Sequence, residues 1–160
     1  MDGEWRVDDR AAWDRLDGAA PWQQFWAYGA AVEALGGRVL RGVARAGRRV
    51  VAQAQFTARS LGPLAHGALA ARGPVFAPDA TAAERAAACR TLRRSAPLRW
   101  PRLVLLAPEG VAGADLRAAG LSCVMTGAAR AALDLTPDPE ALRAAMDQKW
   151  RNRLRTGERA

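Results

Sequence analysis

An alternation of polar and apolar residues in the second quarter of the chain predicts a β-hairpin. The segments 38–44 and 49–59 have the composition of strands, and Gly47 lies in the short loop between them, where a positive φ is favoured. Within the second segment the period is two, as in a half-buried strand: Gln53, Gln55 and Thr57 alternate with Ala52, Ala54 and Phe56. Further strands are predicted over residues 66–71, 102–107, 121–126 and 131–135. The segment 102–107 is almost continuously apolar, which is typical of a strand covered on both faces.

Capping residues and helical periodicity predict helices between and around these strands. The predicted helices are a short one that begins at Asp8 or Asp9 and buries Trp13 and Leu16, and longer ones over 22–35, 81–94, 113–119 and 138–160. The helix at 22–35 stops at a pair of glycines, Gly36 and Gly37. A capping box of Thr81 and Glu84 starts the next one.

The helix predicted over 22–35 carries a dense group of aromatic residues. Within seven residues it holds four aromatic side chains: Trp22, Phe25, Trp26 and Tyr28. Packing in the core is the simpler interpretation. Gln23 and Gln24 beside them keep a ligand platform open as the alternative, because amides both donate and accept hydrogen bonds and so fit polar ligands.

The end of the sequence combines an apolar stripe with an excess of basic residues. Asp138 is suited to the N-cap and Pro139 to the first turn of the last helix. Apolar residues recur on this helix every four positions, at Leu142, Met146, Trp150 and Leu154. Basic residues surround them: Arg143, Lys149, Arg151, Arg153, Arg155 and Arg159. We expect such a helix to have a partner, with Trp150 as the apolar contact and Arg151 and Arg155 free to bind anions.

The order of elements predicts an α/β fold with a mixed, mostly antiparallel central sheet flanked by helices. No linker, repeat or low-complexity segment divides the chain, so we expect a single domain over residues 1–160. Half of the residues are hydrophobic and a quarter are charged, which is typical of a globular protein. No segment has the length and apolarity of a membrane span, and the acidic N-terminus does not fit a signal peptide.

The formal net charge of +8 raises the question of a nucleic-acid partner. Lys149 is the single lysine, whereas arginine and alanine are abundant along the whole sequence. We therefore favour a compositional bias over a dedicated binding face. Two distant cysteines, Cys89 and Cys123, do not make a disulfide framework, and we expect a reducing, cytoplasmic setting.

Residues with catalytic chemistry are few. His66 is the single histidine, so neither a Ser-His-Asp or Cys-His set nor a metal site of histidines and cysteines can be assembled. The N-acetyltransferases that use acetyl-CoA bind its pyrophosphate on a [Q/R]-x-x-G-x-[G/A] turn that leads from a strand into a helix. The segments 59–64 and 117–122 approach this pattern, but both lack its last residue.

Four segments, taken together and in order, resemble the Fem-type peptidoglycan aminoacyltransferases and related acetyltransferase-like proteins. PWQQFW at 21–26, leading to a glycine, resembles their early Q-s-x-x-W helix, and LAARGPV at 69–75 resembles an R-G-P-V strand end. ALDL at 132–135 with PEAL at 139–142 resembles their closing strand and helix start. KWRNRLR at 149–155 is similar to their basic helix K-x-R-x-x-I-R-x-A. The similarity spans nearly the whole chain.

This resemblance implies a fold of the N-acetyltransferase (GNAT) superfamily and transfer of an acyl or aminoacyl group to an amine. Fem-type proteins carry two such modules with the reaction in the cleft between them, and the resemblance covers the first. By position it assigns Gln24, Trp26 and Arg72 to binding of a phosphorylated acceptor. It also implies acyl-CoA or aminoacyl-tRNA as donor, and a small molecule or cell-wall precursor as acceptor. The implied protein partner is a second GNAT-like module or a second copy, and nucleic acid enters only as the aminoacyl-tRNA donor.

Two other functions stay open at this point. A non-catalytic interaction module would dock the stripe around Trp150 on a partner protein. A nucleic-acid binder would place the arginines of 143–159 on phosphates. The scarcity of catalytic residues does not exclude a transferase, because positioning an activated acyl group beside an amine supplies much of the rate enhancement.

Overall fold

The computed structural model describes residues 1–5, 7–14, 20–125 and 134–159. They belong to two compact units, Met1–Thr126 and Gly127–Ala160, and each unit is described by itself. Among the described helices, none is long and apolar enough to cross a membrane.

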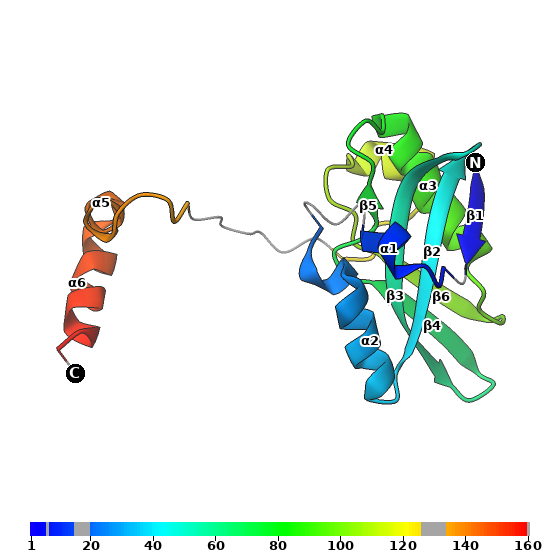
Figure 1. The fold of residues 1–160 in the computed structure, drawn as a ribbon, viewed down its shortest axis with the longest axis horizontal. Coiled ribbons are helices and arrows are strands. Elements are labelled where there is room, and N and C mark those ends of the chain that lie inside the picture. The colour runs from blue at the N-terminus through cyan, green and yellow to red at the C-terminus, as the bar shows by residue number, and fades with distance from the viewer. Residues whose placement is uncertain (6, 15–19, 126–133, 160) are drawn as a thin grey trace. The chain divides into compact units, whose positions relative to one another are not determined.

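A mixed, mostly antiparallel sheet forms the centre of the first unit and gives it the predicted α/β fold (Figure 1). Its strands are β1 (Asp2–Trp5), β2 (Arg38–Ala46), β3 (Arg49–Leu61), β4 (Ala65–Ala70), β5 (Val75–Phe76) and β6 (Arg102–Leu106). They lie in the order β1-β2-β3-β4-β6, and β5 pairs with β3 as well. The pair of β4 and β6 is parallel, whereas the other pairs in the described sheet are antiparallel.

The hairpin predicted from the alternating pattern is present. β2 and β3 pair along their length up to Ala46 and Arg49, and Gly47, with φ 59°, lies in the turn between them. A positive φ favours glycine there, because a side chain would crowd the backbone. β4 and β6 confirm the strands predicted at 66–71 and 102–107, with bounds that differ by one residue.

Helices cover both faces of this sheet (Figure 1). They are α1 (Arg10–Trp13), the 3₁₀ helix η2 (Trp22–Gln24), α2 (Trp26–Ala34), α3 (Ala82–Ser95) and α4 (Gly113–Ala118). The predicted caps are confirmed. The Asp9 carboxylate accepts from Ala12 N at 3.0 Å at the start of α1, and Thr81 and Glu84 form the capping box of α3.

Several local expectations are wrong. β1 is a short polar segment that pairs with β2, and its sequence does not predict a strand. The helix predicted over 22–35 is interrupted at Phe25, whose extended backbone (ψ 144°) separates η2 from α2. Residues 121–125 form no strand, since no described segment pairs with them. Leu16, residue 126 and residues 131–133 of the predicted strand 131–135 lie outside the described residues.

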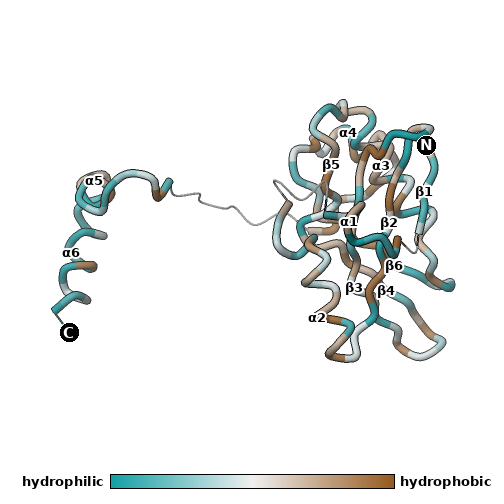
Figure 2. Tube along the Cα trace, viewed as in Figure 1, coloured by the Kyte–Doolittle hydropathy of each residue, from teal (hydrophilic) through white to brown (hydrophobic). Residues whose placement is uncertain are grey.

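The face of the sheet toward α3 is an apolar core of mostly small side chains. Phe56 and Leu92 are fully buried in it, among alanines that are at most 6% exposed: Ala44, Ala52, Ala54, Ala58, Ala68, Ala70, Ala77, Ala80 and Ala88. Figure 2 shows this concentration of hydrophobic residues in the first unit, in contrast to the mainly hydrophilic α6. Small side chains let α3 approach the sheet closely. Burial also raises the pKa of the Cys89 thiol to about 12, so this cysteine behaves as a hydrophobic residue.

The other face of the sheet is open over β4 and β6. Leu69 and Leu103 remain 42% and 57% exposed, and strand register places both on the same face. The expectation that 102–107 is covered on both sides is therefore wrong. The helices on that side contact β2 and β3 instead.

The second unit contains two helices, α5 (Pro139–Ala145) and α6 (Gln148–Gly157). Asp138 caps α5 by accepting from Ala141 N, as predicted. The prediction of a single helix over 138–160 is wrong, because the backbone of Met146 is extended (ψ 146°) and Asp147 is the N-cap of a separate helix, α6. In the preceding segment Asp134 and Leu135 are not in a strand.

Candidate functional site

An interruption in the sheet is filled by the side chain of Gln24. β4 ends at Ala70 and β5 begins at Val75, and both pair with the same edge of β3. Between them the chain leaves β3, and Arg72 takes a positive φ of 53°. Gln55, which lies on β3 opposite this gap, receives no strand partner on that side.

The amide of Gln24 takes the place of the missing strand backbone. Its Oε1 accepts from Gln55 N at 2.7 Å, and its Nε2 donates to Gln55 O at 3.2 Å and to Ala71 O at 2.8 Å. A primary amide carries the same donor and acceptor as a peptide group, so it satisfies backbone groups that would otherwise be buried without partners. A Cβ at Gly73 would come within 2.6 Å of Gln24 Nε2, which explains a glycine in this position.

Two further glutamines of β3 connect the covering helices to the sheet. Gln55 donates to Gln23 O at 3.3 Å and to Phe25 O at 3.0 Å, around the break between η2 and α2. Gln53 donates to Trp13 O at 3.0 Å. Gln24, Gln53 and Gln55 are the three buried polar side chains found in the described residues. Together they hold α1, η2 and the start of α2 on this face.

Trp26 lies beside an arginine that belongs to the same network. The guanidinium of Arg41 stacks 3.9 Å from the centre of the Trp26 ring, and its Nε donates to Gln55 Oε1 at 3.0 Å. The Glu33 carboxylate forms an ion pair with the Arg41 guanidinium, with 3.2 Å between Oε2 and Nη2. The edge of Trp13 contacts the Trp26 ring with 6.4 Å between centroids. Such a stacked and hydrogen-bonded arginine is held in one orientation.

Arg72 stands at the outer edge of the interruption. Its Nε donates to Glu109 at 2.9 Å, and its side chain is about one-third exposed. Behind it, Ala107 N donates to both Ala70 O and Gly73 O, which ties the end of β6 to the interruption. Hydrogen bonds thus fix the backbone around Arg72, while part of its guanidinium side chain remains accessible to solvent.

The three predicted acceptor-binding residues have different relations to Gln55 and different roles. Gln24 contacts Gln55 directly, whereas Trp26 is linked to it through Arg41 and Arg72 follows Ala71, whose carbonyl accepts from Gln24. Gln24 has no exposed surface and its hydrogen bonds go to the backbone, so it holds the site together. Trp26 is half-buried, and Arg72 retains the exposure that a ligand contact needs. Sequence reasoning missed Gln55, Arg41 and Trp13 as members of this site. For Gln55 the sequence does contain an indication, because the polar residues of β3 alternate with residues that are all apolar.

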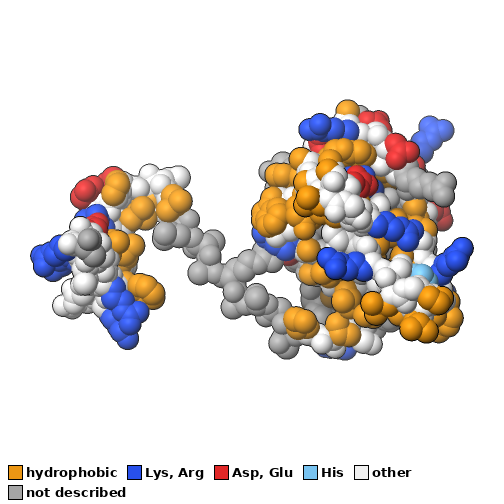
Figure 3. Space-filling view, turned by 90° about the horizontal axis from the view of Figure 1, so that it is seen from below, with side chains coloured by type: hydrophobic (Ala, Val, Ile, Leu, Met, Phe, Trp, Pro, Cys, Tyr) orange, Lys and Arg blue, Asp and Glu red, His pale blue; other side chains and the backbone are white. Residues whose placement is uncertain are grey.

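Part of the predicted aromatic group remains exposed next to this network. Trp22 is 57% and Phe25 38% exposed, and Trp22 packs edge-on against Tyr28 with 5.1 Å between centroids. Figure 3 shows hydrophobic side chains gathered in patches on one face of the first unit, with arginines between them. Gln23 Oε1 is buried without a hydrogen-bond partner in the described structure. Both features are compatible with a ligand platform.

Groups for covalent or metal chemistry are sparse. No cluster of metal ligands occurs among the described residues. His66 Nδ1 lies 2.8 Å from Ser60 Oγ, at an exposed strand end without a carboxylate beside it in the described part of the chain. The two segments that approach the pyrophosphate pattern do not lead from a strand into a helix. Gly62 lies in the β3–β4 turn and Gly120 follows the end of α4.

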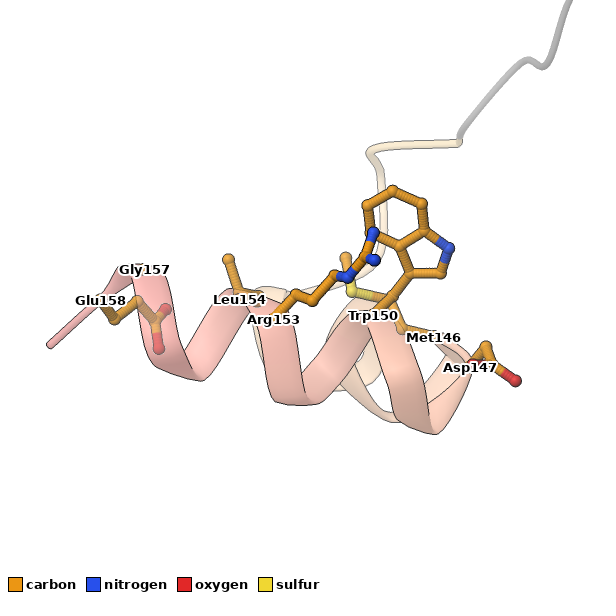
Figure 4. Close-up of a pocket in the computed structure, with 7 residues that line it drawn as sticks. All are labelled: Met146, Asp147, Trp150, Arg153, Leu154, Gly157 and Glu158. Atoms are coloured by element: carbon orange, nitrogen blue, oxygen red, sulfur yellow. The ribbon is translucent and has the colours of Figure 1, made fainter. Parts of the chain in front are cut away.

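In the second unit three residues of the apolar stripe, Met146, Trp150 and Leu154, line an open groove of about 580 Å³ (Figure 4). Trp150 and Leu154 project from α6 toward the side on which Met146, just before this helix, also lies, and Arg153 stacks over the Trp150 ring. Trp150 is 61% exposed. Arg151 donates to Ala144 O at 2.8 Å and so braces α5, whereas Arg155 is exposed.

Comparisons of the chain with protein-family models, with curated proteins and with solved structures found no match.

Proposed function

We propose that this chain is an acyl- or aminoacyltransferase module of the GNAT type that transfers an acyl group to an amine. The observation that carries the proposal is the arrangement of Gln24, Trp26 and Arg72 around Gln55. Gln24 bonds to the Gln55 backbone and to Ala71 O, and Ala71 precedes Arg72 in the chain. Trp26 stacks on Arg41, which donates to the Gln55 side chain. These residues, named by the Fem-type resemblance, are far apart in the sequence. The cytoplasmic setting expected from the sequence belongs to the same proposal.

In this proposal Arg72 binds the phosphate of the acceptor. Its guanidinium is partly exposed and is held by Glu109, an exchangeable carboxylate partner. Arginine forms paired hydrogen bonds to phosphate with a geometry that lysine lacks. The acceptor amine would attack the acyl carbonyl carbon of the donor, forming a C–N bond as the bond to the donor's sulfur or ribose oxygen breaks. The proton lost by the amine ends on that sulfur or oxygen, which leaves as the thiol of coenzyme A or the hydroxyl of the tRNA. The protein supplies position, and the missing catalytic set is consistent with that role.

Ligand-induced stabilisation tests this proposal. Thermal unfolding should be followed with acyl-CoAs, an aminoacyl-tRNA and a phosphorylated cell-wall precursor. A bound ligand at about 100 Kd raises the Tm by roughly 5–10 °C for a protein of this size. Arg72→Ala should abolish the shift caused by the precursor, whereas Arg117→Ala, an exposed arginine of α4, should leave it unchanged. Absence of any shift with all three ligand classes overturns the proposal.

A second candidate is a protein-interaction module, and the groove around Trp150 favours it. An exposed tryptophan beside Met146 and Leu154 has the apolar character of an interface centre. Sedimentation and iodide quenching distinguish the cases when wild type is compared with Trp150→Phe. A self-associated protein with a protected Trp150 supports this candidate. A monomer in which iodide quenches Trp150 freely contradicts docking on a second copy.

A further inference from the structure

The arginines of the first unit fall into two groups. In one group each arginine has a carboxylate partner: Arg10 with Asp14, Arg41 with Glu33, Arg45 with Glu4, Arg49 with Asp79 and Glu84, and Arg72 with Glu109. The second group has no such partner in the described structure, and four of its members lie within ten residues: Arg90, Arg93, Arg94 and Arg99. All four are exposed.

This second group lies in a stretch without acidic residues. From residue 85 to residue 108 the chain holds six arginines and no aspartate or glutamate. Two of the six are committed to main-chain carbonyls. Arg85 donates to Ala80 O, and Arg102 donates to Arg94 O and Ala96 O. The other four retain their charge and hydrogen-bonding groups for a partner.

Helix geometry places these arginines on one surface. Arg90 and Arg94 are one turn apart on the side of α3 opposite to its buried Ala88, Cys89 and Leu92. Arg93 flanks them. The guanidinium of Arg102 binds the carbonyls at the end of α3, so the loop 96–101 folds back toward that end and carries Arg99 with it.

The same loop exposes a tryptophan. Trp100 is 84% exposed, more than Trp22 at 57% or Trp150 at 61%. No described aromatic ring stacks on it. An exposed indole that directly follows Arg99 in the chain offers a flat face on which another ring system can stack. We call Arg90, Arg93, Arg94, Arg99 and Trp100 the α3 surface.

We propose that the α3 surface binds single-stranded nucleic acid. The arginines would contact successive phosphates and Trp100 would stack on one base, the combination by which single strands are bound without sequence preference. A duplex offers the phosphates but keeps its bases stacked, so it would use the arginines alone. This inference is independent of the proposed transferase function, because the α3 surface shares no residue with the network around Gln55.

Binding of fluorescein-labelled dT15 and U15 to the full chain, measured by anisotropy at several salt concentrations, tests the proposal. We expect a Kd on the order of micromolar at low salt and a linear fall of log K with log salt. The triple variant Arg90→Ala, Arg93→Ala, Arg94→Ala should reduce the slope by about 2, at about 0.7 per phosphate contact. Trp100→Ala should weaken binding about tenfold, and Trp100→Phe less.

Two matched triple variants control for net charge. One removes the exposed arginines Arg38, Arg48 and Arg117, and the other removes Arg151, Arg153 and Arg155 of α6. Binding that survives both but fails in the α3 triple supports the proposal. Equal losses in all three, or loss only in the α6 triple, overturn it. So does a 15-bp duplex that binds as tightly as dT15 and is equally weakened by Trp100→Ala, or binding to anionic vesicles but to neither oligonucleotide. Unchanged far-UV circular dichroism shows that each variant is folded.

Discussion

The two faces of the central sheet are held to their helices in different ways. Toward α3 the contact is apolar, with Phe56 and Leu92 among small alanines. Toward α2 it is a polar network: the Gln24 side chain bonds to the Gln55 backbone, and the Gln53 and Gln55 side chains donate to carbonyls of the covering segments. An apolar contact depends on volume and tolerates a similar residue, whereas a buried polar network requires every partner.

This difference bears on function. A binding site must hold its side chains in fixed orientations, and directional hydrogen bonds do so better than apolar contacts. Of the candidate acceptor-binding residues, Gln24 belongs to this polar network and Trp26 stacks on its Arg41. The following substitutions, ordered by expected effect, test whether the two faces differ as described.

Gln24→Leu should cause the largest loss of stability. It keeps the volume of the side chain but leaves Gln55 N–H, Gln55 C=O and Ala71 C=O without their partner. Each buried group left unsatisfied costs about 1–3 kcal/mol, and Ala71 O is only partly buried, so we expect a loss in the lower half of the summed range, about 3–5 kcal/mol. Urea unfolding measures it. A loss below about 1 kcal/mol contradicts the role given to this amide.

Gly29→Ala should weaken the same face by about 1–3 kcal/mol, the cost typical of overpacking. The added Cβ would lie 2.5 Å from Arg41 Nη2 and closer still to Gln55 Oε1, so the bond between those side chains must break. Gly67→Ala on β4 is the control, because its Cβ would have 4.0 Å to the nearest atom. If both variants unfold at the same urea concentration, α2 is not packed closely against the network.

Phe56→Leu on the apolar face should cost less, about 1–2 kcal/mol, because one apolar side chain replaces another in the core. Comparison with Gln24→Leu is the informative measurement. Both introduce leucine at a fully buried position, yet we expect the polar face to lose more. An equal or larger loss at Phe56 removes the distinction between the faces.

Much of the apolar face could be predicted from the sequence, and much of the polar face could not. Alternation in β3 predicted which residues face together, and the capping box of Thr81 predicted the start of α3. The same alternation placed Gln53 and Gln55 on a half-buried strand, although both are buried. A strand pattern cannot show what covers its polar face. Gln24 is the clearest case, since its role depends on a gap between β4 and β5 that only the folded sheet defines.

The C-terminal unit illustrates a related limit. The four-residue spacing of Leu142, Met146, Trp150 and Leu154 predicted one continuous helix. Asp147 is an N-cap residue in the middle of that pattern, and its local hydrogen bond to Lys149 N prevails over the periodicity. Met146, Trp150 and Leu154 nevertheless share one groove.

The smallest effect is expected at the start of α3. Thr81→Ala should cost about 1 kcal/mol, as for other N-cap residues. Hydrogen bonds from Thr81, with the nearby Arg49, hold the pKa of Glu84 below its ordinary value. Because this pKa is lower in the folded than in the unfolded state, the ionised carboxylate stabilises the fold at pH values above the ordinary pKa of a glutamate. This contribution is lost as the pH falls through the lowered pKa. In Glu84→Gln the free energy of unfolding should therefore fall less steeply with decreasing pH than in the wild type. An unchanged decrease at acid pH contradicts this assignment.

Hydrogen exchange at the Gln55 backbone amide tests the central claim most directly. In the wild type its N–H is bonded to Gln24 Oε1, so it should exchange slowly, in the class of the core strands. In Gln24→Leu it should lose this protection, while the amide of Phe56, on the hairpin side of β3, should exchange more slowly than that of Gln55 in the same variant. Equal and fast exchange of the Gln55 amide in both proteins would contradict the claim that a side-chain amide completes the sheet between β4 and β5.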